Sequence, residues 1–205
     1  MYIPKDFRNT DEAIAKDFIR QHSFGILVSQ VEGKLWATHT PMLLTENDTK
    51  LSGHIAKGNK QWKEFNGTEV LAIFSGAHSY VSSSWYDHEN VPTWNYLITH
   101  VYGNVRIIEG EELYQSLKQL VDKYEKKSER PVAMEKFSPD FLKHEIQGVV
   151  GFEIKISRIE SAQKLSQNRN DRDYHSIITH LEKNGDENST GIASAMKNNR
   201  KLNEL

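Results

Sequence analysis

Residues 24–44, which read FGILVSQVEGKLWATHTPMLL, indicate the fold most clearly. Two apolar or β-branched runs, at 24–30 and 34–44, are separated by Val31, Glu32 and Gly33. A short turn that contains glycine between two such runs is typical of a β-hairpin. We therefore predict two antiparallel strands that are neighbours in a sheet.

Further strands and three helices surround this hairpin. The strand pattern recurs at 50–55, 69–75, 79–85, 96–108 and 149–159. Helical spacing of apolar residues is found at 11–22 and 111–124, and Ser138-Pro139 opens a shorter helix that ends at Glu145. Because a parallel sheet would need a helix at every crossover, the pattern favours a mainly β fold with some α structure. We predict a small antiparallel barrel of six or seven strands with peripheral helices.

The C-terminal part has a different composition. Residues 160–205 contain seven Asn, seven acidic and seven basic residues. We expect a barrel domain at 1–162 and a polar helical extension at 163–205, with the core upstream of the extension. Two helices are predicted in the extension, at 173–182 and 188–202. This helical hairpin could also be a DNA-binding helix-turn-helix, but its only basic cluster is Lys197, Arg200 and Lys201, and packing on a barrel or a partner subunit is the commoner role.

Composition excludes several classes of protein. The chain has no Cys, which excludes disulfides, a cysteine nucleophile and thiolate-bound zinc or iron–sulfur clusters. The 26 Lys and Arg residues against 28 Asp and Glu give a net charge of −2, whereas nucleic-acid binders usually carry a concentrated basic excess. No apolar run approaches the ~18 residues of a membrane span, and the N-terminus lacks a signal peptide. We expect a cytoplasmic protein with no membrane partner.

Common catalytic signatures are also missing from the sequence. There is no G-x-G-x-x-G motif after a strand, no P-loop and no G-x-S-x-G elbow. The histidines lack metal-ligand spacing along the chain. We therefore predict no metal site and no catalytic set.

The segment LSGHIAKGNKQW at 51–62 is the most informative for function. A strand that ends in His54 and Lys57, followed by a short helix that begins near Asn59, offers an imidazole, an ammonium and an amide to one anion. Free N–H groups at a helix start would add to them. We interpret the segment as a phosphate-binding loop. The competing interpretation is a strand that runs into a solvated basic turn.

Two aromatic segments and one strand provide further candidates. Trp85 and Trp94 lie in SSSWY and PTWNY, where they could stack on a planar ligand, or else belong to a core or a subunit interface. On the second strand of the hairpin, alternation places Thr38 and Thr40 on one face and His39 on the other. A buried, hydrogen-bonded His39 is the default expectation.

Several long blocks resemble one known family. They are MYIPKDF, GHIAKGNKQW, AIFSGAHSYVSSSWY, VPTWNY followed by HVYGNVR, and KLSQNR. In this order they look like the blocks of the PaiB family, a branch of the FMN-binding split-barrel proteins. The resemblance implies a split β-barrel and a homodimer whose flavin sites lie between the subunits. It also implies a role in negative transcriptional regulation of protease production and sporulation.

The resemblance also implies which residues contact the cofactor. His54, Lys57 and Asn59 would meet the FMN phosphate. The residues expected to line the site beside them are Thr38, His39, Thr40, Trp62, Trp85 and Trp94. One departure is Gly58-Asn59-Lys60, where the family block has Ala-Asn-Pro, and a looser loop there would weaken cofactor binding. We expect a flavin-binding repressor, with an FMN-dependent oxidoreductase as the alternative and direct DNA contact poorly supported by the charge.

Overall fold

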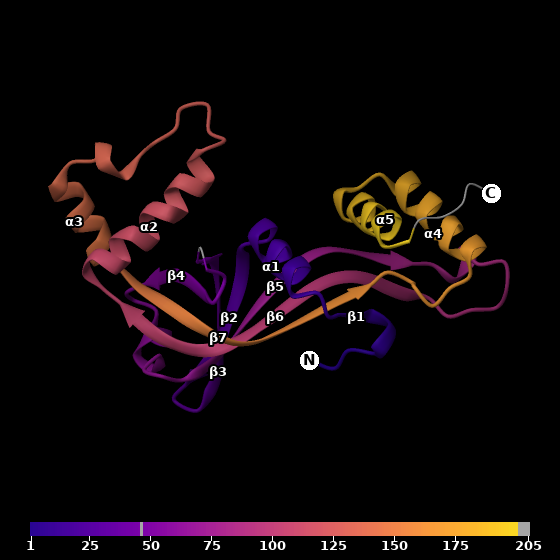
Figure 1. Cartoon of the computed structure of the whole chain (residues 1–205), viewed down its shortest axis with the longest axis horizontal. Helices are drawn as coiled ribbons and strands as arrows, with labels where there is room; N and C mark the ends of the chain where they lie inside the picture. Colours follow the sequence, from indigo (N-terminus) through magenta and orange to yellow (C-terminus); the bar gives the residue numbers. More distant parts are fainter. Residues whose placement is uncertain (46, 201–205) are drawn as a thin grey trace. The chain divides into compact units, whose positions relative to one another are not determined.

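The computed structural model describes residues 1–45 and 47–200 (Figure 1). The strands are β1 Arg8–Asn9, β2 Phe24–Val31, β3 Lys34–Leu44, β4 Lys50–Ala56, β5 Glu69–Val81, β6 Thr93–Ile108 and β7 Val149–Lys164. The helices are α1 Glu12–Gln21, α2 Gly110–Glu125, α3 Pro139–Gln147, α4 Asp171–Asn184 and α5 Glu187–Asn199. The described residues also form short 3-10 turns, which are η1 Lys5–Phe7, η2 Lys60–Glu64, η3 Ser83–Trp85 and η4 Met134–Lys136.

The predicted hairpin is confirmed, and its turn is tighter than the sequence indicated. Val31 pairs with Lys34, so only Glu32 and Gly33 form the loop. Both have positive φ angles, of 53° and 72°. This is the combination that a two-residue type I′ turn requires, and its twist matches that of the flanking strands.

The strands form one sheet that closes on itself. Their order is β1-β7-β4-β3-β2-β5-β6, and an additional pairing of β6 with β7 closes a ring of six strands. The two-residue strand β1 adds to the ring by pairing with Ser161 and Ala162 of β7. The predicted antiparallel barrel of six or seven strands is therefore confirmed.

A glycine permits the close approach of β6 and β7. A Cβ atom at Gly103 would lie 2.3 Å from the Lys155 carbonyl oxygen, which is closer than non-bonded atoms can come. Glycine is the one residue that avoids this clash, so Gly103 marks a place where two backbones approach directly.

One predicted pair of strands is wrong. Residues 69–75 and 79–85 were expected as separate strands, but β5 runs without a break from Glu69 to Val81. Gly76 does not interrupt the strand. The end of the second predicted strand is instead η3, where the Ser82 side chain accepts a hydrogen bond from the Ser84 N–H group.

The chain divides into two compact units. The sheet unit contains Ile19–Phe74 and His100–Ile159, and the hairpin unit contains Met1–Phe18, Ser75–Thr99 and the chain from Glu160 onward. Strands β5, β6 and β7 contribute residues to both. The expected boundary between a barrel domain at 1–162 and an extension at 163–205 stays a prediction.

Large apolar side chains fill the centre of the sheet unit. Leu27, Met42, Leu51 and Phe74 are fully buried. Phe65, which follows η2, meets Phe152 of β7 edge to face, with their ring centroids 5.6 Å apart. Aromatic pairs in this geometry stabilise a core beyond their buried area, and this pair fixes the loop after β4 against the sheet.

The hairpin unit has a core of its own, which corrects the expectation that the tail is only a polar extension. Helices α4 and α5 lie side by side (Figure 1), and their apolar faces are buried against the end of β5 and the segment after it. The buried residues of this cluster are Val81, Tyr86, Leu165, Tyr174, Ile177, Ile178, Leu181, Ile192, Ala193 and Met196. Leu202, which we expected on the second helix, lies outside the described residues.

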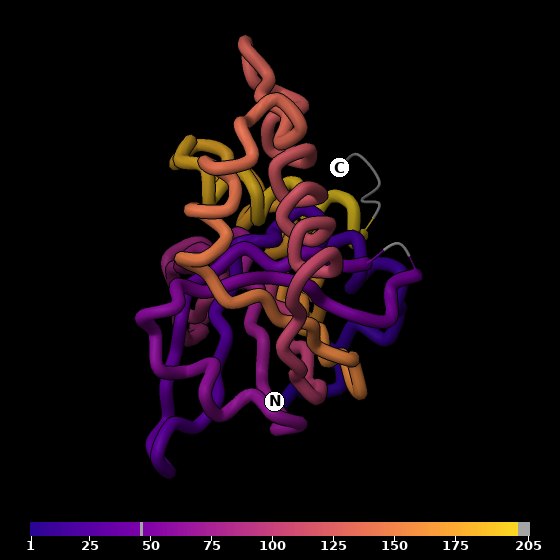
Figure 2. The backbone as a smooth tube through the Cα atoms, turned by 90° about the vertical axis from the view of Figure 1, so that its left-hand side faces the viewer, coloured from indigo at the N-terminus to yellow at the C-terminus, as the bar shows by residue number. Residues whose placement is uncertain are grey.

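The remaining helices follow the predictions closely. Ser138 caps α3 by accepting a hydrogen bond from the Phe141 N–H group, and Pro139 is the first helical residue. Figure 2 shows α2 as the long salmon helix of the sheet unit, with a loop that returns the chain to α3. Across the described residues, each helix falls short of the length and hydropathy that a membrane span requires.

Candidate functional site

The segment that follows β4 forms the predicted short helix. Asn59 is extended, and its side chain accepts a hydrogen bond from the Gln61 N–H group, so that it caps η2. Asn is among the best capping residues because its carbonyl oxygen can replace a missing helical acceptor. The expected strand, loop and helix of residues 51–62 are therefore present as one continuous structure.

A small polar network holds this loop against β3. Asn59 Nδ2 donates to Thr38 Oγ1 at 2.8 Å, and Thr38 Oγ1 donates to Gln61 Oε1 at 2.6 Å. Gln61 Nε2 donates in turn to the Leu27 carbonyl and to Ser29 Oγ on β2. Thr38 and Asn59 thus form hydrogen bonds with one another and with Gln61, and these bonds hold the loop against β3. Contact of either residue with a cofactor stays a prediction.

Gln61 is the member of this network that sequence reasoning missed. Its side chain is fully buried. A glutamine that lies among lysines is expected to be exposed to solvent, because glutamine is seldom buried. The available signal was its place two residues after a helix-capping Asn, where the chain turns back over the sheet.

His54 and Thr40 meet at the next position along the sheet. Thr40 is buried, and its Oγ1 donates to the His54 carbonyl at 2.7 Å. The His54 imidazole is half-buried and has no hydrogen-bond partner among the described residues. Burial lowers the pKa of His54 because water no longer solvates the charged ring. A bound anion would stabilise the protonated, charged form of this imidazole.

Lys57 is the exposed cation of the loop. Its backbone is fixed on both sides, since its N–H group donates to the Gly148 carbonyl at 2.8 Å and its carbonyl accepts from Trp62 Nε1 at 2.9 Å. Its ammonium group has no acidic partner within the part of the chain that the structure describes. A lysine with a fixed backbone and an unpaired ammonium group is well suited to bind an anionic ligand.

The loop departs from the family block without distortion. No atom lies within 4 Å of a Cβ built on Gly58, and its φ angle is not in the left-handed region. Asn59 has φ −76° and ψ 120°, which is a conformation that a following proline accepts. The loop therefore adopts a shape that Ala-Asn-Pro could also adopt.

His39 is exposed, which corrects the expectation of a buried histidine. The alternation itself holds, because Thr38 is half-buried, Thr40 is buried and His39 lies on the other face. The His39 ring stacks against Phe24 of β2 with centroids 6.3 Å apart, and Phe24 is itself 63% exposed. The outward face of this sheet therefore carries aromatic surface rather than a covered core.

Trp85 and Trp94 belong to the hairpin unit. Trp85 stacks on His180 of α4 with centroids 5.0 Å apart and an interplanar angle of 11°, and its carbonyl accepts from Ser176 Oγ. Trp94 is half-exposed beside His78 and Tyr80. Trp85 therefore packs as part of the helical hairpin, while Trp94 keeps a face open to solvent.

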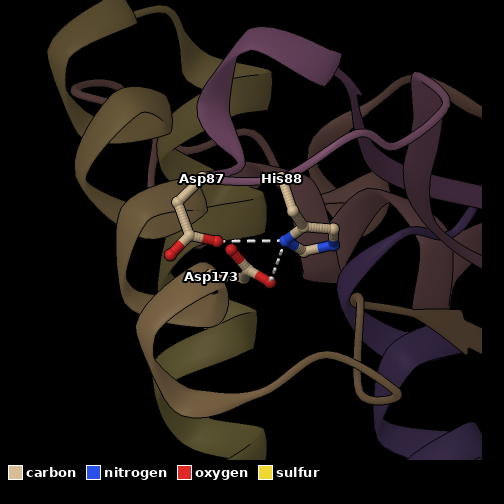
Figure 3. A group of neighbouring side chains, drawn as sticks. All are labelled: Asp87, His88 and Asp173. Carbon is tan, nitrogen blue, oxygen red and sulfur yellow. Dashed lines mark hydrogen bonds and ion pairs between the residues drawn. The ribbon is translucent and has the colours of Figure 1, made fainter.

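A cluster of two carboxylates and an imidazole lies in the same unit (Figure 3). His88 Nδ1 is 3.0 Å from Asp87 Oδ1 and 3.7 Å from Asp173 Oδ2. Both carboxylates have further partners, because Arg172 lies 2.6 Å from Asp87 and Asn170 donates to Asp173 at 2.9 Å. The group has the composition of a metal site, but both carboxylates already contact other side chains of the protein.

The described basic residues of the C-terminal cluster, Lys197 and Arg200, form contacts within the protein. Lys197 pairs with Glu182 at 2.6 Å, and Arg200 pairs with Asp171 at 3.0 Å. Arg200 also donates to the carbonyls of Gln167 and Arg169. Lys201 lies outside the described residues. The described part of this cluster therefore forms intramolecular contacts rather than an unpaired basic surface.

Comparisons with known proteins place this geometry in a family. The family model described as "Putative FMN-binding domain" matches residues 1–158. The chain is 43% identical over 204 residues to "Protease synthase and sporulation protein PAI 2" of Bacillus subtilis, which covers 98% of this chain and 99% of that protein. It is also 30% identical over 155 residues to the uncharacterized protein YKL070W of Saccharomyces cerevisiae, covering 62% of this chain and 92% of that one.

Solved structures agree on the fold. A conserved hypothetical protein of Mycobacterium tuberculosis matches with a TM-score of 0.59 at 14% identity, over 82% of this chain and 92% of its own. An FAD and heme binding protein of Mycobacterium smegmatis matches with a TM-score of 0.57 at 12% identity, over 77% of this chain and 73% of its own. These structures support the fold alone. The match to the FMN-binding family model over residues 1–158 and the 43% identity to the relative from Bacillus subtilis show that the protein belongs to the PaiB family of split-barrel proteins with an FMN-binding domain.

Proposed function

We propose that this protein is an FMN-binding regulator whose flavin site is built on the loop after β4. The single observation that carries the proposal is that the side chains of His54 and Lys57 have no partner among the described residues. Both groups can bind an anion, and both lie in the family block that the resemblance assigns to the phosphate. An imidazole near the end of a strand and a cation in the loop that follows it, both without a partner, are what a phosphate site requires before its ligand binds.

The residues present fit a flavin mononucleotide. Lys57 and the half-buried His54 would hold the phosphate. The network of Asn59, Thr38 and Gln61 would keep the loop in place, so that little backbone ordering is needed on binding. Bound FMN would supply a redox-active ring, and the side chains of this chain would bind and orient it rather than react.

The outward face of β2, β3 and β5 supports a homodimer. Cross-strand partners on this face are Ile26 with His39 and with Ile73, and Val28 with Ala37 and with Leu71. Phe24 and Leu35, at its two ends, are 63% and 80% exposed. A sheet face this apolar is costly to leave in water and marks an interaction surface. We propose that a second copy of the chain covers it, as in the dimer that the family resemblance implies.

The regulatory role follows the relative from Bacillus subtilis, whose name refers to protease synthesis and sporulation. We propose that this chain represses genes of that kind and that flavin binding, rather than DNA contact by the tail, carries its signal. The net charge of −2 and the paired state of Lys197 and Arg200 support this choice. A cytoplasmic location is part of the same proposal.

The proposal is tested by adding FMN to the purified chain. We expect a shifted flavin spectrum and a higher melting temperature at saturating FMN, because a ligand that binds only the folded state stabilises it. No shift and no stabilisation would contradict flavin binding. Bound flavin that a nicotinamide donor reduces faster than free flavin would identify an oxidoreductase and contradict a purely regulatory role.

A further inference from the structure

A cavity lies within the hairpin unit, apart from the residues assigned to flavin. Its volume is about 200 Å³, and the basic residues Lys164 and Arg169 contribute to its lining. No carboxylate is among the described residues that line it. The cavity is smaller than the ~300–1,000 Å³ of sites that hold drug-sized ligands, so its ligand is a small molecule or one end of a larger one.

The two cations have neutral neighbours. Lys164 Nζ donates to Thr93 Oγ1 and lies 5.7 Å from the centre of the Phe7 ring. The Arg169 guanidinium lies over the Tyr86 ring at 5.3 Å. Neither cation is paired with an acidic side chain in the described part of the chain. Two positive charges that share a partly closed cavity repel one another, and each loses hydration there.

The proximity of the two cations affects the pKa of the Lys164 amine. Burial lowers the pKa of Lys164, and the positive charge of Arg169 lowers it further. An anion between the two side chains would oppose this lowering of the pKa, because an opposite charge favours the protonated amine.

The loop that carries the cavity is held in a fixed and strained shape. Ser166 has a φ angle of 59°, in the left-handed region that residues other than glycine seldom adopt. Its Oγ donates to Asn95 Oδ1 at 3.1 Å, and its carbonyl accepts from the Arg169 N–H group at 3.0 Å. The Arg200 guanidinium donates to the carbonyls of Gln167 and Arg169. Backbone strain that its surroundings maintain is typical of binding sites.

We propose that this cavity is a second anion site, which binds the phosphate group of a small phosphomonoester. A dianion matches the two cations, and the Thr93 hydroxyl offers a third contact. Phe7 and Val91 supply an apolar wall for the body of the ligand. The site does not depend on the proposed function, since it shares no residue with the flavin loop.

The test is calorimetric titration with inorganic phosphate and with glycerol 3-phosphate. It uses the full chain carrying Lys57→Met, which weakens the proposed flavin loop, and all variants are compared within this background. In this background we expect Lys164→Met and Arg169→Gln each to weaken binding of both probes at least about tenfold, because each change removes one hydrogen bond to a charged group. Lys183→Met, at an exposed position on α4, is the matched control and should leave the affinity unchanged.

Equal phosphate affinity in the Lys164 and Arg169 variants and the control would overturn the proposal. So would binding of acetate in preference to both phosphate probes. If Lys164→Met does not fold, as judged by circular dichroism, Arg169→Gln decides alone, because it leaves the contact of Lys164 with Thr93 in place. FMN binding by the chain with its natural Lys57 is measured separately. An absence of FMN binding by that chain would contradict the proposed function but would not contradict the second anion site.

Discussion

Gln61 shows how a single buried amide organises the candidate flavin loop. It connects β2, β3 and the cap of η2 through hydrogen bonds to Leu27, Ser29 and Thr38. A buried amide is stabilising only when its donors and acceptors are satisfied, and here the Nε2 and Oε1 atoms are both used. The short helix that follows Lys57 is therefore held against the sheet by a residue that would not touch a ligand itself.

The loop departs from the family block at two residues, and restoring them is expected to stabilise the protein. Gly58→Ala places its Cβ in open space, and Lys60→Pro puts proline at the first position of η2, where no hydrogen bond of the described chain uses the N–H group. Each change restricts the unfolded chain, which is worth about 0.4–1 kcal/mol of unfolding free energy. Urea unfolding of the single and double variants measures it. A loss of stability in either single variant would show that the loop differs from the shape described.

His54 predicts a pH dependence of stability. Burial lowers its pKa in the folded state below the value of the unfolded chain. The stability that comes from a neutral His54 is therefore complete above the unfolded pKa, and it is lost as the pH falls below that value. We expect unfolding free energy to decrease from about pH 7.5 to about 5.5, and to decrease less in His54→Gln.

The measurement is the urea midpoint of both proteins across this range. Burial lowers the pKa of His22 in the same way, so His22→Gln serves as the comparison for a second buried histidine. Identical pH profiles for the unchanged protein and His54→Gln would show that His54 titrates as it does in the unfolded chain.

At the scale of elements, residues with a clear period were easy to predict. The strand at Lys34–Leu44 has the predicted bounds, and α2 extends the prediction of 111–124 by one residue at each end. The misread segment is Gly76–His78, where a glycine inside a long strand resembled a turn. Long-range packing decided that case, because β5 continues to Val81, whose side chain is buried in the core of the hairpin unit.

The helical hairpin of the tail is expected to be a stabilising part of the molecule. Ile177 on α4 is fully buried, so Ile177→Ala removes packed methyl groups and leaves a cavity. Such changes cost about 2–5 kcal/mol of unfolding free energy. His175→Ala, at an exposed position on the same helix, should change it by less than about 0.5 kcal/mol. Thermal or urea unfolding that gives equal values for both variants would mean that α4 is not packed as described.

The candidate site was less predictable than the fold. His54, Lys57 and Asn59 stand in one quoted segment, so local order along the chain was enough to associate them. The contact of Asn59 with Thr38 depends on the register of β3 beside the returning loop, which the sequence does not state. Trp85 was expected either beside a ligand or in a core or interface, and the structure stacks it on His180. Its contact with a ligand stays a prediction.

At the scale of the whole molecule, the outward face of β2, β3 and β5 predicts self-association. We expect the unchanged protein to sediment as a dimer, and Phe24→Lys combined with Leu35→Lys to sediment as a monomer, since a charge in an apolar interface is costly to bury. Tyr2→Lys alters a 90% exposed aromatic residue of the hairpin unit and should leave the dimer intact. A dimer that persists in the double variant would exclude this face as the interface.

The central claim is that the loop after β4 binds the phosphate of FMN through Lys57. The most direct measurement is an FMN titration, followed by flavin fluorescence, of the unchanged protein, Lys57→Met and Lys63→Met. Lys63 is an exposed lysine of η2 and serves as the matched control. We predict that Lys57→Met weakens FMN binding about tenfold or more while Lys63→Met leaves it unchanged. Equal FMN affinity in all three proteins, or no FMN binding by the unchanged protein, would contradict the account.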